Sequence, residues 1–262
     1  MISAILLTGL TGCGSKDGKD GSSVNTLGMA GNKKTSTLQS QQSIPQPSQP
    51  SVAEMLQDSV AIYRAQAEEL LPEVESLKKE FDSLNNKLVT DNGTEGIEKY
   101  RVLPGWKGYD PMSKSGIIAR LLESGDIEIV ATSTSGAFSS ISLSAGGQSV
   151  STGSVSSGSG LNYTVGNTTR VTFIGKEALN LCNFAKSHSN STITLNFKGG
   201  SNSSVSLSKS QTEMLATFAS ILDAESKYEA ARKKYMLAYN KMTFYDEEAK
   251  KLPTPSEPSP IN

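Results

Sequence analysis

The chain has 262 residues, which allows one large domain or two small ones. Its 25 basic and 26 acidic residues nearly cancel, so charge gives no reason to expect a nucleic acid partner. Hydrophobic residues make up 36% of the chain and aromatic residues 6%, which indicates substantial tails and a serine-rich middle rather than one extensive core. No apolar run reaches the roughly 18–20 residues that a membrane-spanning helix needs.

The first twelve residues are apolar and lead directly to a cysteine. Leu10-Thr11-Gly12-Cys13 places an aliphatic residue and two small residues at this point. The run resembles the lipobox of bacterial lipoproteins, in which a peptidase cuts before the cysteine, its sulfur carries diacylglycerol and its new amine is usually acylated. The resemblance implies a signal peptide over residues 1–12 and Cys13 as the lipid attachment residue. Two or three acyl chains on one residue, of the palmitate type, would anchor the chain stably in a membrane.

The residues on either side of this motif bear on the predicted signal peptide and on the membrane to which the chain would be sorted. No Lys or Arg precedes the apolar run, so we expect either that the natural start lies upstream or that the signal is weak. Gly14 rather than Asp follows the cysteine, which in enterobacterial-type sorting implies the outer membrane, on its periplasmic or its surface face. The alternative is a short buried terminus with an ordinary cysteine, but the Gly, Ser, Lys and Asp residues that follow could not continue a core. Residues 13–51 are predicted to be a flexible tether.

The stretch from Val52 to Leu88 predicts a long helix, assigned to residues 52–90. Ser51 and Glu54 form a potential capping box at its start, and Pro72 predicts a kink rather than a break. Apolar residues recur at alternating steps of three and four through five heptads, which is typical of a coiled-coil seam. The two seam positions are occupied by Ala53, Val60, Ala67, Val74, Phe81 and Leu88, and by Leu56, Tyr63, Leu70, Leu77 and Leu84.

A second long helix is predicted over residues 211–251, where large and small seam residues alternate. The large ones are Met214, Ile221, Tyr228, Tyr235 and Met242, and the small ones are Thr217, Ala224, Ala231 and Ala238. Similar lengths favour an antiparallel helical pair with the middle of the chain inserted at its far end. One alternative is two amphipathic helices packed flat on the middle domain. Another is a homo-oligomer in which the helices pair between chains.

The segment 91–210 is predicted to be a small α+β head. We expect helices over Ser115–Ser124 and Lys176–Ser187, and strands over 127–131, 138–144, 148–155, 161–165, 170–174, 192–198 and 205–207. Gly146-Gly147 and Gly199-Gly200 are expected to be turn glycines. The loop 97–112 holds the only tryptophan, Trp106, and is expected to pack its aromatic residues on the core; the alternative is an aromatic platform for a ligand. The fold class is therefore predicted as α+β, a long antiparallel coiled-coil stalk with a small inserted head, a disordered N-terminal tether and a disordered Pro-rich C-terminal tail over 252–262.

Few residues suggest chemistry. Cys182 and His188 are six apart, so one helix would place them on different sides, and we expect Cys182 to be an inert buried thiol. One His and two Cys allow no metal cluster of standard spacing, and no cofactor is predicted. A disulfide is excluded if Cys13 carries lipid. The remaining candidates, acidic residues without diagnostic spacing, are Asp110, Glu123, Asp126, Glu128 and Glu177.

These features favour a non-enzymatic bacterial lipoprotein with a binding, assembly or structural role in the cell envelope, anchored through Cys13. Its expected partners are the membrane and another envelope protein. Exclusion lipoproteins of phages and plasmids resemble this expected arrangement of a lipid anchor, a tether and a small domain, which is an analogy at the level of architecture. The main alternative is an envelope hydrolase with a cleft in the 91–210 segment.

Overall fold

The structure is a computed structural model, and it describes residues 50–92, 99–109 and 114–253. The chain divides into two units, 1–48 and 49–262, and described residues occur only in the second. The predicted signal peptide, Cys13, nearly all of the tether, Asp110 and most of the tail therefore lie outside the described residues. Within the part that is described, no helix is both long and apolar enough to cross a membrane.

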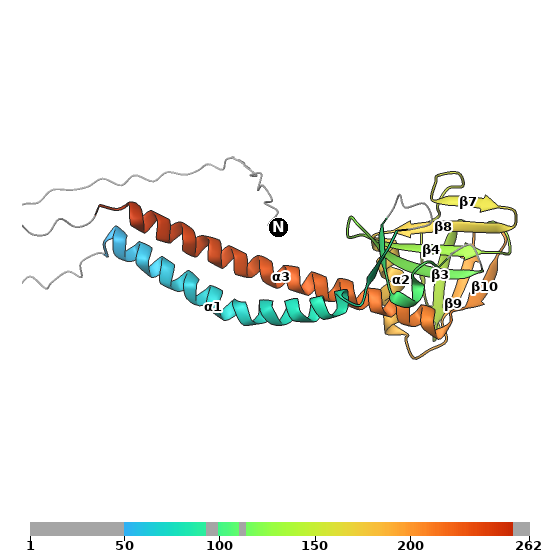
Figure 1. The fold of residues 1–262 in the computed structure, drawn as a ribbon, viewed down its shortest axis with the longest axis horizontal. Helices are drawn as coiled ribbons and strands as arrows, with labels where there is room; N and C mark the ends of the chain where they lie inside the picture. The colour runs from blue at the N-terminus through green and yellow to red at the C-terminus, as the bar shows by residue number, and fades with distance from the viewer. Residues whose placement is uncertain (1–49, 93–98, 110–113, 254–262) are drawn as a thin grey trace, which may run out of the picture. The chain divides into compact units, whose positions relative to one another are not determined.

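Helix α1 (Val52–Asn85) begins at the capping box that the sequence predicts. The backbone N–H of Ser51 donates to Glu54 Oε2 at 2.7 Å, and the backbone N–H of Glu54 donates to the Ser51 hydroxyl at 3.3 Å. The helix is continuous through Pro72, and Figure 1 shows it changing direction part-way along its length. It ends before Leu88, because the chain turns there into the first strand of a sheet.

Two antiparallel sheets form the middle of the chain. The larger has six strands in the order β1-β2-β3-β4-β8-β7, and the smaller has four in the order β10-β9-β5-β6. The strands are β1 (Val89–Asp91), β2 (Tyr100–Val102), β3 (Gly116–Leu122), β4 (Ile127–Ser133), β5 (Ser140–Ala145), β6 (Gln148–Ser151), β7 (Asn162–Val165), β8 (Thr168–Ile174), β9 (Thr194–Lys198) and β10 (Ser203–Ser206). The strands predicted between 127 and 207 are confirmed, with small shifts at their ends.

The hairpin between β5 and β6 turns through two glycines. Gly146 and Gly147 have φ values of 56° and 78°, a conformation that glycine adopts without steric cost. Two consecutive residues in this region make the tight turn whose twist matches the flanking strands. The assignment of these two residues as turn glycines is confirmed.

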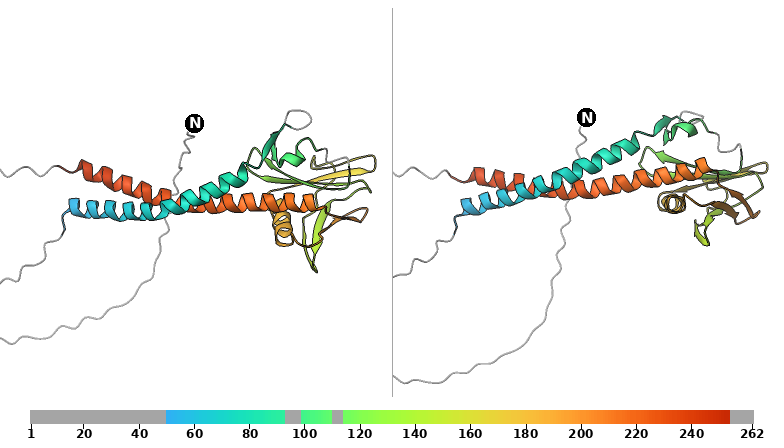
Figure 2. Two further views of the ribbon diagram at one scale, coloured as in Figure 1. Left: turned by 60° about the horizontal axis from the view of Figure 1, so that its bottom comes forward. Right: turned by 90° about the horizontal axis from the view of Figure 1, so that it is seen from below.

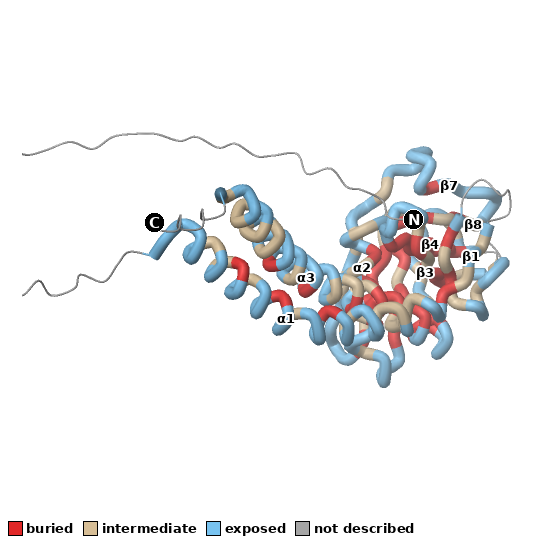
Figure 3. The backbone as a smooth tube through the Cα atoms, turned by 60° about the vertical axis from the view of Figure 1, so that its left-hand side comes forward, coloured by how far each residue is buried: buried red, intermediate tan, exposed pale blue. Residues whose placement is uncertain are grey.

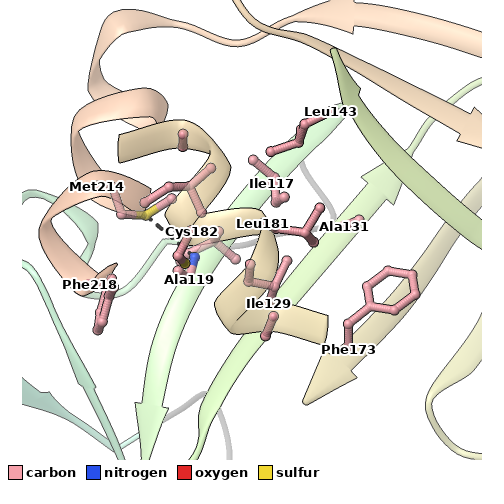
Figure 4. Packing of buried hydrophobic residues seen from close by; sticks show 14 of the residues in the cluster. Ile117, Ala119, Ile129, Ala131, Leu143, Phe173, Leu181, Cys182, Met214 and Phe218 are labelled. Atoms are coloured by element: carbon pink, nitrogen blue, oxygen red, sulfur yellow. Dashed lines mark hydrogen bonds between the residues drawn. The ribbon is translucent and has the colours of Figure 1, made fainter. Parts of the chain in front are cut away.

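One core holds the sheets and helices together. Helix α2 (Lys176–Ser187) has the predicted bounds, and α3 (Lys209–Lys251) begins slightly earlier than predicted. The apolar faces of both sheets pack with α2 and the first turns of α3 into a single cluster. Figure 4 shows Leu181 and Cys182 of α2 and Met214 and Phe218 of α3 near residues of the sheets, among them Ile117, Ala119 and Ile129. The backbone N–H of Ala119 also donates to Met214 Sδ at 3.4 Å.

The predicted fold class, a coiled-coil stalk with a small inserted head, is wrong. The structure is a β-rich α+β fold with antiparallel sheets of six and four strands. The first turns of α3 belong to the core of the sheets, to which they contribute Met214, Leu215, Phe218, Ala219 and Ile221. In α1, only Val60, Ala67 and Val74 are buried, while the second predicted seam position stays partly exposed. A coiled coil buries both positions, so the heptad pattern overstated the packing between the helices.

The later part of α3 runs beside α1 in the opposite direction in the views of Figures 1 and 2. The Tyr63 and Tyr245 rings stack with centroids 5.6 Å apart, and those of Phe81 and Tyr228 are 6.1 Å apart. Figure 3 shows isolated buried positions on these helices between exposed turns. The contact is made by aromatic side chains together with buried alanine and valine side chains, among them Val60 and Val74 of α1. Several large apolar side chains remain exposed, among them Ile62, Leu237 and Phe244.

The helix predicted over Ser115–Ser124 is also wrong, because this segment is strand β3. Ile117 and Ala119 lie opposite Ala131 and Ile129 of β4, and the intervening Ile118 is buried as well. A strand buried on both faces reads as a continuous apolar run. Periodicity alone does not distinguish such a run from a short buried helix.

Candidate functional site

A pocket of about 870 Å³ lies where the end of α1 meets β1, β2, β3 and α3. Small-molecule sites usually have volumes of roughly 300–1,000 Å³ and combine an apolar lining with a few polar groups. Here the apolar and aromatic lining comes from Phe81, Tyr100, Leu121, Leu122 and Ile221. The polar lining comes from Asn85, Thr90, Asn92, Lys99, Arg101, Glu123 and Glu225. This combination makes the pocket the candidate binding site.

Arg101 of β2 closes the carboxyl end of α1. Its Nη1 donates to Asn85 Oδ1 at 2.7 Å, and its Nη2 donates to the Asn85 backbone oxygen at 2.9 Å. The last turn of α1 contains no basic residue, so a cation from β2 supplies the positive charge that a helix carboxyl end favours. Arg101 therefore fixes β2 against α1 and shapes one side of the pocket.

Glu225 of α3 is the half-buried carboxylate of the pocket. Burial raises the pKa of this carboxyl group, and the like charge of Glu229 adds to the increase, while the Arg101 guanidinium opposes it. No hydrogen bond or ion pair joins the Glu225 carboxylate to another residue of the described ranges. Since the Arg101 guanidinium is already bound to Asn85, Glu225 lines the pocket as a negative charge without a direct partner there.

A buried ion pair supports the Tyr100 side of the pocket. Arg120 of β3 and Glu128 of β4 are opposite one another in the ladder, and Arg120 Nε pairs with Glu128 Oε2. The two side chains are only 13% and 8% exposed. The guanidinium carbon of Arg120 lies 3.5 Å from the centre of the Tyr100 ring, a cation–π contact that holds the ring in place.

Cys182 and His188 lie in different environments of helix α2 and its end. Cys182 is fully buried among core residues, and burial strongly raises the pKa of its thiol, which disfavours the nucleophilic thiolate. His188 caps the end of α2, where its ring stacks on Phe184 at 4.2 Å and its Nδ1 lies 3.0 Å from the Phe184 carbonyl oxygen. The expectation that Cys182 is a buried packing residue is confirmed.

The predicted acidic candidates are dispersed. Glu128 pairs with Arg120, Asp126 Oδ2 accepts the Ser124 hydroxyl at 3.0 Å, and Glu177 Oε1 accepts the Gly153 backbone N–H at 2.8 Å. Among the members of this group that the structure describes, only Glu123 lines the pocket. In the described ranges, no group of three or more His, Cys, Asp or Glu residues could hold a metal ion.

No family model, curated protein or solved structure matches this chain.

Sequence reasoning missed the residues that define the pocket. It assigned Phe81 and Ile221 to helical seams and gave no role to Arg101 or Glu225. The sequence held a weak signal for Arg101. The last turn of α1 has no basic residue, so a cation from another element can bind the free carbonyl groups at that end of the helix. For Glu225 the signal is a carboxylate beside the small residue Ala224 on the packed side of a helix.

Proposed function

We propose that this chain is a membrane-anchored bacterial lipoprotein with a non-enzymatic binding, assembly or structural role in the cell envelope. The observation that carries the proposal is the lipobox-like run Leu10-Thr11-Gly12-Cys13, which ends an apolar segment and precedes a polar one. The implied location is the outer membrane, with an envelope component as partner. The pocket beside α1 supports the binding role, because its mixed lining suits recognition of a ligand. Phage or plasmid exclusion is one form that this role could take.

Metabolic labelling with a palmitate analogue in a bacterial host tests the anchor. The wild-type chain should be labelled and should sediment with membranes, whereas Cys13→Ser should lose both properties. Cys182→Ala is the matched control and should be labelled like the wild type, since Cys182 is buried. Equal labelling of wild type and Cys13→Ser, or no labelling of either, would contradict the proposal.

An envelope glycoside hydrolase is the second candidate, and the observation that favours it is the presence of two carboxylates, Glu123 and Glu225, in one pocket. Glycoside hydrolysis uses such a pair, one of them with a raised pKa. Digestion of purified cell-wall glycan by the wild type but not by Glu225→Gln would establish this candidate. Absence of digestion by the wild type would reject it.

A further inference from the structure

The charges that line the pocket are not equivalent. The terminal nitrogens of Arg101 donate to the side chain and backbone of Asn85, so this cation is committed to the end of α1. Lys99 and Glu123 are exposed and can be solvated by water. Glu225 differs from both, because it is half-buried, lies one turn from Glu229, and has no hydrogen bond or ion pair with another described residue.

This asymmetry determines which ligand charge fits. An anion in the pocket would find Arg101 already bound to Asn85, so its available cation among the described lining residues would be the exposed, water-solvated Lys99. It would also approach the Glu225 carboxylate, which costs free energy. A cation would pair with Glu225 and remove the penalty of a desolvated, unpaired carboxylate. A cation also suits the lining, since Phe81 presents a partly exposed aromatic ring and Leu122 a partly exposed aliphatic side chain that can pack against methylene groups.

We propose that the pocket binds an organic cation, an alkylammonium group on an apolar chain, with Glu225 as its counter-ion. This inference deepens the proposed binding function by naming the chemistry of the ligand. Two sources offer that chemistry: a free small amine of the envelope, or a lysine side chain presented by a partner protein. In either case the ammonium pairs with Glu225, and the methylene chain contacts Phe81 and Leu122.

The test uses the full chain carrying Cys13→Ser and follows NMR shifts during titration with n-pentylamine. 1-Pentanol is the matched neutral probe, since it has the same chain without the charge. We expect pentylamine to bind at least about tenfold more tightly than pentanol, because a hydrogen bond to a charged group contributes that much or more. Glu225→Gln should reduce pentylamine affinity about tenfold and bring it near that of pentanol. Glu229→Gln, one turn away and outside the pocket lining, should leave it within about twofold.

A second titration separates the two sources of the amine. A short acetylated peptide with one central lysine should bind through Glu225 if a partner protein supplies the cation, and only pentylamine should bind if the ligand is a small molecule. Failure of both probes to bind, or equal affinity in the wild type and Glu225→Gln, would overturn the proposal.

Thermal unfolding distinguishes a ligand-binding carboxylate from a structural one. Glu225→Gln should keep or raise the melting temperature, because it removes an unpaired, partly desolvated charge. A lowered melting temperature would mean that Glu225 serves the fold through Arg101, and would count against the proposal. These outcomes are independent of palmitate labelling at Cys13, so failure of amine binding and failure of the lipoprotein proposal are distinguishable.

Discussion

At the residue scale, the Arg120–Glu128 pair illustrates how the sheet accommodates charge. Both side chains are largely removed from water, yet each has a partner directly across the ladder, and Arg120 also covers the Tyr100 ring. The net stability of such a pair is small, because desolvation offsets most of the attraction. The loss of one partner is different, since the remaining charge stays buried without compensation.

We predict that Arg120→Met and Glu128→Leu each lower the free energy of unfolding by about 3–5 kcal/mol. The double variant Arg120→Met/Glu128→Leu should recover most of that loss, because it leaves no unpaired charge. Urea denaturation of the three variants measures this cycle. The exposed pair formed by Lys78 and Asp82 is the control, and Lys78→Ala should change stability by no more than about 1 kcal/mol. Additive losses in the double variant would show that the two charges are not coupled.

At the element scale, the start of α3 joins a helix cap to a strand. The backbone N–H of Ser208 donates to Gln211 Oε1 at 3.0 Å, and the backbone N–H of Gln211 donates to the Ser208 hydroxyl at 3.3 Å. Gln211 Nε2 also donates to the Ile117 backbone oxygen at 3.2 Å. Gly116 makes room for this contact, because a Cβ at that position would lie 2.6 Å from Gln211 Nε2. The same side chain therefore caps α3 and attaches it to β3.

Gln211→Ala is predicted to lower the free energy of unfolding by about 1–3 kcal/mol, because it leaves the buried Ile117 carbonyl without this donor. Glu54→Ala removes the matching residue of the α1 capping box, which is exposed, and should cost at most about 1 kcal/mol. Guanidinium denaturation of both variants provides the comparison. Equal losses would indicate that the contact with β3 adds nothing to the cap.

At the scale of the whole described unit, α3 has two environments along its length. Its first turns lie in the core shared by the two sheets and α2, and its later turns are largely exposed beside α1. Figure 3 shows this change from buried to mostly exposed positions along the helix. Substitutions of large apolar residues on the same helix should therefore differ in effect according to position.

Phe218→Ala should lower the free energy of unfolding by about 3–5 kcal/mol, since Phe218 is fully buried in the core. Leu237→Ala, at a position that is 59% exposed, should stay within about 0.5 kcal/mol of the wild type. Urea unfolding followed by circular dichroism and by fluorescence of Trp106, which packs against the core, measures both. Similar losses in the two variants would contradict this division of α3.

Local patterns predicted the elements whose signals are strong at short range. The capping box at Ser51, the turn glycines Gly146 and Gly147, and helix α2 all depend on neighbouring residues, and the structure has them where the sequence predicts. The strand β3 was assigned wrongly, because a run that is apolar on both sides has no usable period. Its identity as a strand follows from pairing with β4, which lies across a turn.

The sequence by itself determined which residues of α3 form an apolar stripe, but not what that stripe packs against. A helical stripe buries its area as well against a sheet as against another helix, so the heptad spacing predicted a stalk where the first turns of α3 complete the core of two sheets. The pocket depends on tertiary structure in the same way. Phe81, Arg101 and Glu225 are far apart in the chain, and their roles follow from β2 lying against the end of α1 and beside α3. A site whose residues come from distant parts of the chain gives no local pattern in the sequence, because the fold alone brings those residues together.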